Sequence, residues 1–305
     1  MGFRFAVSNL ECKLVSVAIM FLGCDWTLAQ KPTAQNLAAE RNVATIIQKS
    51  VEANDRDWNA DPRFDYFERD RGPDGTKTYD VTNVLGTPYE RLIEINGRPL
   101  SGQQKEEQQK KFDTMLSQRR AESPEQRAQR IAKFEADRKR DHEMLEQLTK
   151  AFDFQLQGEQ RIGRRQVYTL KATPRRGYHP PNRDTEVLPG MEGRLWIDEA
   201  TYQWVKVEAH VIHPVSIEGF LAQVEPGTRF ELEKAPVQGD IWLTTHYAMK
   251  ASAKVFFLVP HHSEDDETYF NYHPSPASSS NQSSESPQST SNEASSYADS
   301  RSPNR

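Results

Sequence analysis

The feature that most constrains the fold is a run of alternating apolar and polar residues between positions 193 and 258. In residues 204–211, Val205, Val207, Ala209 and Val211 alternate with charged or aromatic side chains. The same period of two recurs in residues 228–234 and 241–251. This period is typical of strands with one buried and one solvated face. The run therefore predicts antiparallel strands that share an apolar face.

Shorter segments with the same character lie on either side of this run. We expect strands at residues 64–67, 77–85, 89–95, 152–156, 166–172 and 268–272. Gly-Pro-Asp-Gly at 72–75 and Asn-Gly at 96–97 are strong turn signals that separate the early strands. Such short connections indicate a meander, in which strands adjacent in sequence are also adjacent in the sheet.

Two other regions have helical patterns. In residues 33–53, an apolar stripe recurs at helical spacing, which suits a helix that lies on a sheet; its members are Leu37, Ala44, Ile47 and Val51. Residues 101–150 are rich in Gln, Glu, Lys and Arg, and Ser123-Pro124 has the form of a helix start. We expect two or three charged surface helices there. They would be either a solvated insertion or a lid or partner surface.

These elements define the expected architecture. The predicted fold class is α+β, with a curved antiparallel sheet that forms an incomplete half-barrel of about nine to eleven strands. An N-terminal helix and the charged helical insertion at 101–150 would cap the sheet. The folded domain is expected to span residues 30–273.

The first 29 residues have the layout of a secretory signal peptide. Arg4 and Lys13 precede an apolar run at 14–22, and Thr27-Leu28-Ala29 stands before Gln30. The run is too short to be a stable membrane span. We therefore expect export to the periplasm or cell envelope.

Both cysteines of the chain, Cys12 and Cys24, lie within this leader. A mature chain that starts at Gln30 would have no thiol for a disulfide, a metal or nucleophilic catalysis. In the alternative interpretation, Phe21-Leu22-Gly23-Cys24 is a lipobox. An acylated Cys24 would then anchor the protein to a membrane.

Charge and composition bear on partners. The chain has 39 basic and 44 acidic residues, and this near-balance gives no reason to expect nucleic acid. Basic residues cluster between Arg161 and Arg183, where they would either neutralise acidic neighbours or contact lipid headgroups or an acidic partner. Residues 274–305 are mostly Ser, Pro, Asn, Gln and Glu. We expect a disordered tail there, because so few apolar residues cannot offset the ordering entropy.

The sequence lacks the common catalytic motifs. It has no Gly-rich phosphate loop after a strand, no His-Glu-x-x-His and no Gly-x-Ser-x-Gly. One group has residue types that suit a divalent metal: His261, His262, Glu264, Asp265 and Asp266. It is either the site of a metal-dependent hydrolase or a solvated hairpin turn. We expect the latter, and a protein that is not an enzyme and uses neither cofactor nor metal.

A strongly curved sheet capped by helices would enclose a cavity, which is the usual place for an apolar ligand. The alternating pattern supplies the candidate lining residues: Leu195, Ile197, Val205, Val207, Phe230, Leu232, Leu243 and Tyr247. Ordinary core packing is the alternative for each of them. The assignment of faces could also be inverted for the whole set.

Several short motifs carry a family resemblance. They are Thr78-Tyr79-Asp80-Val81, Pro88-Tyr89-x-Arg91-Leu92, Asn96-Gly97-x-Pro99-Leu100-Ser101, Gly193-x-Leu195-Trp196-Ile197-Asp198, Gly227-x-x-Phe230-x-x-Glu233 and Ile241-Trp242-Leu243. In this order, the chain resembles secreted bacterial proteins described as outer-membrane lipoprotein-sorting-like. These are distant relatives of the periplasmic lipoprotein carriers with a LolA-like half-barrel. The resemblance implies an incomplete barrel that binds acyl chains or other lipid under a helical lid.

Three functional hypotheses follow. The first is a non-enzymatic envelope protein that holds a lipid or an acylated lipoprotein against the concave face of the sheet. The second is a partner-binding or stress-sensing module that uses the same fold and contacts an envelope protein through residues 101–150. The third is the metal-dependent hydrolase around His261 and His262.

We predict that the mature chain starts at Gln30, because a small residue at Ala29 follows an apolar core of suitable length. N-terminal sequencing of protein from the native envelope would check this. Recovery of an acylated Cys24 as the first residue would contradict the prediction and make the protein membrane-anchored.

Overall fold

The computed structural model describes residues 34–217, 222–255 and 259–276. The predicted leader and nearly all of the predicted tail lie outside the described residues. Within them, the α+β class with a curved antiparallel sheet is confirmed. The sheet has thirteen strands, a few more than expected. The extra ones are short: β4, β9 and β10 have two or three residues each.

The sheet is one open surface built from two meanders. Its strands are β1 (Phe64–Gly72), β2 (Gly75–Val84), β3 (Thr87–Ile95), β4 (Arg98–Pro99), β5 (Phe152–Ile162), β6 (Arg165–Pro174), β7 (Met191–Asp198), β8 (Trp204–Val211), β9 (Val215–Ile217), β10 (Ala222–Val224), β11 (Arg229–Gln238), β12 (Ile241–Val255) and β13 (Val259–Pro274). Their order is β4-β3-β2-β1-β13-β12-β11-β8-β7-β6-β5, with β10 and β9 appended to β12. The two meanders join where β13 pairs antiparallel with β1.

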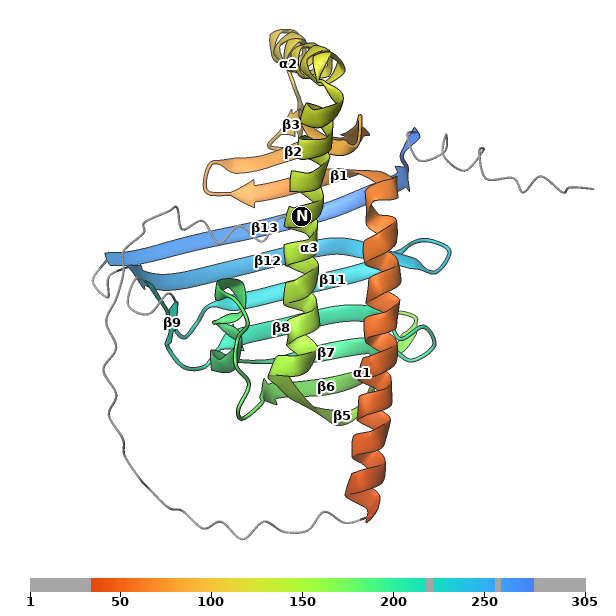
Figure 1. Cartoon of the computed structure of the whole chain (residues 1–305), viewed down its shortest axis with the longest axis vertical. Helices are drawn as coiled ribbons and strands as arrows, with labels where there is room; N and C mark the ends of the chain where they lie inside the picture. The colour runs from red at the N-terminus through yellow and green to blue at the C-terminus, as the bar shows by residue number, and fades with distance from the viewer. Residues whose placement is uncertain (1–33, 218–221, 256–258, 277–305) are drawn as a thin grey trace, which may run out of the picture.

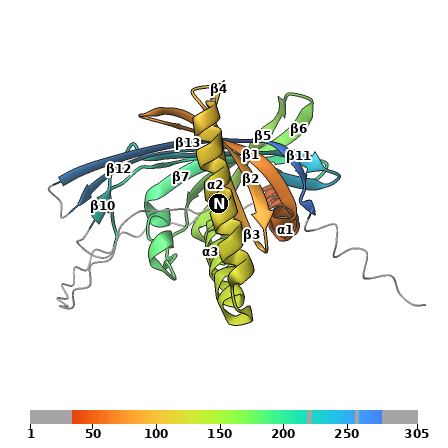
Figure 2. The ribbon, with the colours of Figure 1, turned by 90° about the horizontal axis from the view of Figure 1, so that it is seen from above.

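Three α-helices accompany the sheet: α1 (Ala34–Ala60), α2 (Gly102–Ala121) and α3 (Pro124–Ala151). Short 3-10 turns η1 (Asp61–Arg63), η2 (Arg183–Thr185) and η3 (Leu188–Gly190) occupy the connections. In Figure 1, α1 and α3 cross the strands on the same face of the sheet. Figure 2 shows the sheet arched over these helices, so they lie on its concave side. None of the described helices combines the length and apolarity needed to cross a bilayer.

Local sequence signals fix several element ends. Asn96 and Gly97 both have positive φ, 53° and 69°, which is the geometry that a two-residue hairpin turn requires. Ser123 caps α3 by accepting the backbone N–H of Gln126 at 3.3 Å, while the Gln126 side chain accepts the Ser123 N–H. The helix start expected at Ser123-Pro124 is therefore confirmed.

Helix α2 stands apart from the core, and none of its residues is buried. Two arginines tie the α2–α3 hairpin to the turn between β2 and β3. The Arg119 guanidinium donates to the carbonyl oxygens of Val84 and Thr87 at 2.6 and 2.9 Å. Arg130 donates to the hydroxyl of Thr87 at 2.8 Å and pairs with Glu122. The expectation of charged surface helices thus describes α2, whereas α3 lies across the sheet.

Helix α1 buries a stripe that differs from the expected one. Val43 and Ile46 enter the central core cluster, but Ala44 is exposed. Further along, three polar residues occupy the buried side: Ser50, Asn54 and Asp57. Buried polar groups need hydrogen-bond partners, so the rotation of α1 is set by polar contacts as well as by apolar packing.

Asp57 is the hub of these contacts, with only 2% of its side chain exposed. Its carboxylate accepts from Lys234 Nζ of β11 at 2.9 Å and from the Trp242 backbone N–H of β12 at 3.0 Å. It also accepts from Gln203 Nε2 at 3.2 Å. Asn54 Oδ1 accepts from the same Lys234 ammonium at 2.8 Å. One carboxylate therefore joins α1 to strands β11 and β12 and to the turn that precedes β8.

We predict that Lys234→Met lowers the free energy of unfolding by about 3 kcal/mol, because it leaves the Asp57 carboxylate buried without its cation. Urea denaturation of the purified protein measures this. The matched control is Lys250→Met, which removes an exposed pair with Glu264 on the convex face and should change stability little. Equal losses in the two variants would contradict the prediction.

Candidate ligand-binding cavities

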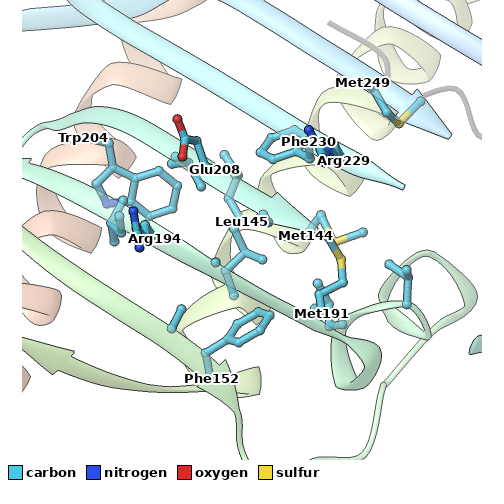
Figure 3. A pocket seen from close by; sticks show the side chains of 18 of the residues that line it. Met144, Leu145, Phe152, Met191, Arg194, Trp204, Glu208, Arg229, Phe230 and Met249 are labelled. Carbon is cyan, nitrogen blue, oxygen red and sulfur yellow. The ribbon is translucent and has the colours of Figure 1, made fainter. Parts of the chain in front are cut away.

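An apolar cavity of about 100 Å³ lies between the C-terminal half of α3 and the concave face of the sheet. From α3 it is lined by Met144, Leu145 and Leu148. The opposite wall comes from six strands, and its larger apolar side chains include Phe152, Phe154, Met191, Trp204, Phe230 and Met249. Figure 3 shows Met144 and Leu145 facing these strands, with Phe152, Met191 and Phe230 around them. Almost no polar surface lines this cavity.

Small residues form the sheet wall beside these large ones. Ala209 of β8 is paired with Gly193 of β7 on one side and with Phe230 of β11 on the other. A Cβ at Gly193 would lie 2.4 Å from the carbonyl oxygen of Glu208, so no larger residue fits without a shift of the backbone. The small volume of the side chains at Gly193 and Ala209 helps to leave the space open.

The sequence-predicted lining residues fall into three groups. Leu195, Val207 and Phe230 line the apolar cavity. Leu232, Leu243 and Tyr247 line a second cavity, described below. Ile197 is fully buried in the core cluster under α1, and Val205 lines neither cavity. Contact of a ligand with any of these residues stays a prediction.

Val205 differs from expectation because of a β-bulge. Trp196 pairs with Lys206 and Ile197 pairs with Trp204, so Val205 is the extra residue between two pairs. The bulge brings Trp204, rather than Val205, into line with Val207 on the buried face. The simple alternation used to predict one apolar face ends at this point.

The sequence predicts the helical insertion as a cap on the sheet, but the α3 residues that form the cavity wall are not among the predicted lining residues. Met144, Leu145 and Leu148 recur at helical spacing, which is the signal that could have placed this end of the helix against a core. The neighbouring charges of Glu143 and Glu146 weaken this apolar signal, because charged residues favour a solvated surface helix.

The second cavity, of about 140 Å³, lies between α1, α3 and the strands β11–β13 and β1. Its lining mixes aromatic rings with ionisable groups. The rings include Trp58, Tyr66, Tyr247, Tyr269 and Tyr272, and the carboxyl groups belong to Asp57, Asp61, Asp141 and Glu267. Leu145 lines both cavities, so the two chambers share a wall on α3.

Burial perturbs the carboxyl groups at this end of the concave face. It raises the pKa of Asp61 and of Glu267 above the ordinary range. Burial, together with the neighbouring Asp70 carboxyl, raises the pKa of Glu68 to about 9. Carboxyl oxygens of Glu68, Asp70 and Glu267 lie within 4.8 Å of one another. These upward shifts arise because burial removes the hydration that an ionised carboxyl group needs.

Cations that face the second cavity are already matched. Lys234 is held by Asp57 and Asn54. Arg138 of α3 donates to Glu135 at 2.8 Å and to the carbonyl oxygen of Trp58, and its guanidinium lies 4.6 Å from the centre of the Trp58 ring. Burial lowers the pKa of Lys234 even with Asp57 beside it.

His261 and His262 do not form a metal centre with their acidic neighbours. They are consecutive residues of β13, so their side chains leave opposite faces of the strand. Among the described residues, two groups have ligand atoms close enough for a metal, and neither contains these histidines. One is Glu68, Asp70 and Glu267, and the other is Glu231, Glu233 and His246. In the latter, the Lys206 ammonium already pairs with both glutamates.

No protein-family model matches the chain, and no curated protein matches it. Solved structures similar to it include a LolA superfamily protein from Nitrosomonas europaea, at 11% identity and a TM-score of 0.27, over 76% of this chain and 92% of that one. A DUF1329 family protein from Desulfovibrio piger matches at 12% identity and a TM-score of 0.29, over the same shares. MucB from Pseudomonas aeruginosa, in complex with MucA, matches at 12% identity and a TM-score of 0.21, over 74% of this chain and 99% of that one.

Proposed function

We propose that this protein is a non-enzymatic binding protein that holds the acyl chain of a lipid, or of a lipid-modified protein, in the apolar cavity under α3. The observation that carries the proposal is the composition of that cavity: aliphatic, aromatic and methionine side chains make up most of its lining, and Arg194, Glu208 and Arg229 add almost no polar surface. A hydrocarbon chain gains about 0.8 kcal/mol for each methylene that leaves water for such surroundings.

The cavity walls suit a ligand of variable length. Met144 and Met191 are unbranched and can change rotamer at small cost, so they can adapt to different chains. An apolar cavity of about 150 Å³ in another protein stays dry and admits benzene, so a space of about 100 Å³ holds only part of a long chain. We infer that a full acyl chain enters as α3 moves away from the strands, which makes this helix the lid.

The proposed location is the periplasm or cell envelope, since the predicted leader would export the chain. Acyl chains that are in transit there must be shielded from water, and a cavity under a movable helix provides such shielding. Peripheral contact with a membrane through the basic residues of the β5–β6 region would bring the protein close to its ligand.

We predict that Ala209→Phe reduces the affinity for a fluorescent fatty acid by at least about tenfold, because a phenyl ring would fill the space beside Phe230. Circular dichroism should show the parental fold. The matched control is Ala248→Phe, on the convex face of β12, where the same change should leave uptake unaltered. A folded Ala209→Phe protein with parental affinity would contradict the proposal.

The position of α2 favours a second candidate function, in which an envelope protein binds to this helix. No residue of α2 is buried, and Arg119 fixes the last turn of the helix to the β2–β3 turn. A rigid exposed helix has little conformational entropy to lose when a partner binds.

Charge reversal on this helix separates the two candidates. Lys110 and Lys111 are exposed, and Lys110→Glu with Lys111→Glu should leave fatty-acid uptake unchanged. If the helix is a partner site, the double variant should lose a complex that the parent forms in cross-linked envelope extracts. An identical cross-linking pattern for both proteins would contradict a role for α2 as a partner-binding site.

A further inference from the structure

The concave face of the sheet changes character along its width. Under the C-terminal half of α3, strands β5–β8 and β11 present apolar side chains. Towards β1, the same face presents tyrosines and carboxyl groups. Residues that pair directly on neighbouring strands share a face, and Tyr247 pairs with Glu267 while Glu68 pairs with Tyr269. The second cavity opens onto this aromatic and acidic part.

Two carboxyl groups of this part, those of Asp61 and Glu267, have no matching cation among the described residues. Neither Asp61 nor Glu267 forms an ion pair with a described residue, and the hydroxyl of Tyr269 donates to Glu267. The two cations that line the cavity, Lys234 and Arg138, are taken up by Asp57 and Glu135. The cavity therefore carries acidic groups in excess of those that its own cations neutralise.

Aromatic rings surround these carboxyl groups. The ring of Tyr66 lies 5.8 Å from that of Tyr269 and 5.2 Å from that of Tyr272, measured between centroids. Trp58 closes the α1 side, stacked on His142 at 4.5 Å. The indole Nε1 of Trp58 and Nδ1 of His142 are buried, and neither atom has a hydrogen-bond partner among the described residues. Rings that line a cavity beside carboxylates attract organic ammonium groups through the negative faces of the π-systems.

We propose that the second cavity binds the ammonium group of an amine-bearing lipid whose acyl chain occupies the apolar cavity. The shared residue Leu145 makes the two cavities adjacent, so one amphiphile can fill both. This inference rests on the proposed function, because it needs the acyl chain in the first chamber. The ammonium group would supply the positive charge that Asp61 and Glu267 lack, and it would favour their ionised forms.

The aromatic lining distinguishes an organic cation from a metal ion. Glu68, Asp70 and Glu267 could also attract a hard divalent ion, which prefers several oxygen ligands and retained water. Tyrosine and tryptophan rings contribute nothing to that coordination. They stabilise an organic ammonium group by cation–π attraction, and its single positive charge costs less to dehydrate than that of a divalent ion.

The test compares three ligands of one chain length on the full protein: tetradecylamine, tetradecanol and tetradecanoate, each below the concentration at which it aggregates or separates from solution. Isothermal titration calorimetry should give an affinity for the amine at least about tenfold above that for the alcohol, with the carboxylate weakest. Equal affinities for amine and alcohol would overturn the inference while leaving the proposed function intact. Failure of all three ligands to bind would overturn both.

Glu267→Gln identifies the group responsible. Glutamine keeps the size of the side chain and can still accept the Tyr269 hydroxyl, so the fold should be retained. Amine affinity should fall to that of the alcohol, and alcohol affinity should not change. Asp61→Asn provides a second variant with the same expectation. The control is Glu264→Gln on the convex face of the same strand, which should behave as the parent.

Two further arms separate charge recognition from its alternatives. A loss of alcohol affinity in Glu267→Gln equal to the loss of amine affinity would assign the effect to packing and overturn the inference. Calcium ions should not displace tetradecylamine from the parent protein. Displacement at equimolar calcium would show that the cavity is a metal site and would overturn the inference as well.

Discussion

The carboxylate of Asp57 is the interaction on which the concave side depends. It is nearly inaccessible to water, and it accepts hydrogen bonds from Lys234, from the Trp242 backbone and from Gln203. Because a buried carboxylate without partners is very costly, this one contact permits only one depth and rotation of α1 on the sheet. The position of α1 in turn defines one wall of the second cavity.

Both cavities follow from the unequal sizes of the sheet and its helical cover. A helix of 28 residues, as in α3, is about 42 Å long, which is the width of about nine strands at 4.8 Å each. Two helices side by side cover only about 20 Å along the strand direction, or about six residues of each strand. Strands β12 and β13 have 15 and 16 residues. Curvature separates part of the concave face from the helices, and the two cavities lie in the space between them.

Particular residues show how far the sequence could be interpreted. The period of two placed Val207, Phe230 and Leu232 on the buried face, because strand geometry alone dictates which residues share a face. Val205 escaped this logic, since a bulge depends on how β7 and β8 pair and leaves no mark in either strand. The sequence does not predict the mixed cavity, because Glu267 lies far along the chain from Asp61 and Tyr66 and each residue is individually ordinary.

The sequence by itself determined the antiparallel meanders, the Asn96-Gly97 turn and the start of α3 at Ser123, since each depends on contacts within a few residues. Only the tertiary structure decided that α3 closes an apolar chamber and that Leu145 separates it from a polar one. It also decided the pKa of Glu68, which burial and neighbouring carboxyl groups raise to about 9. Such properties depend on what surrounds a side chain in space, and long-range packing brings those surroundings together from distant parts of the chain.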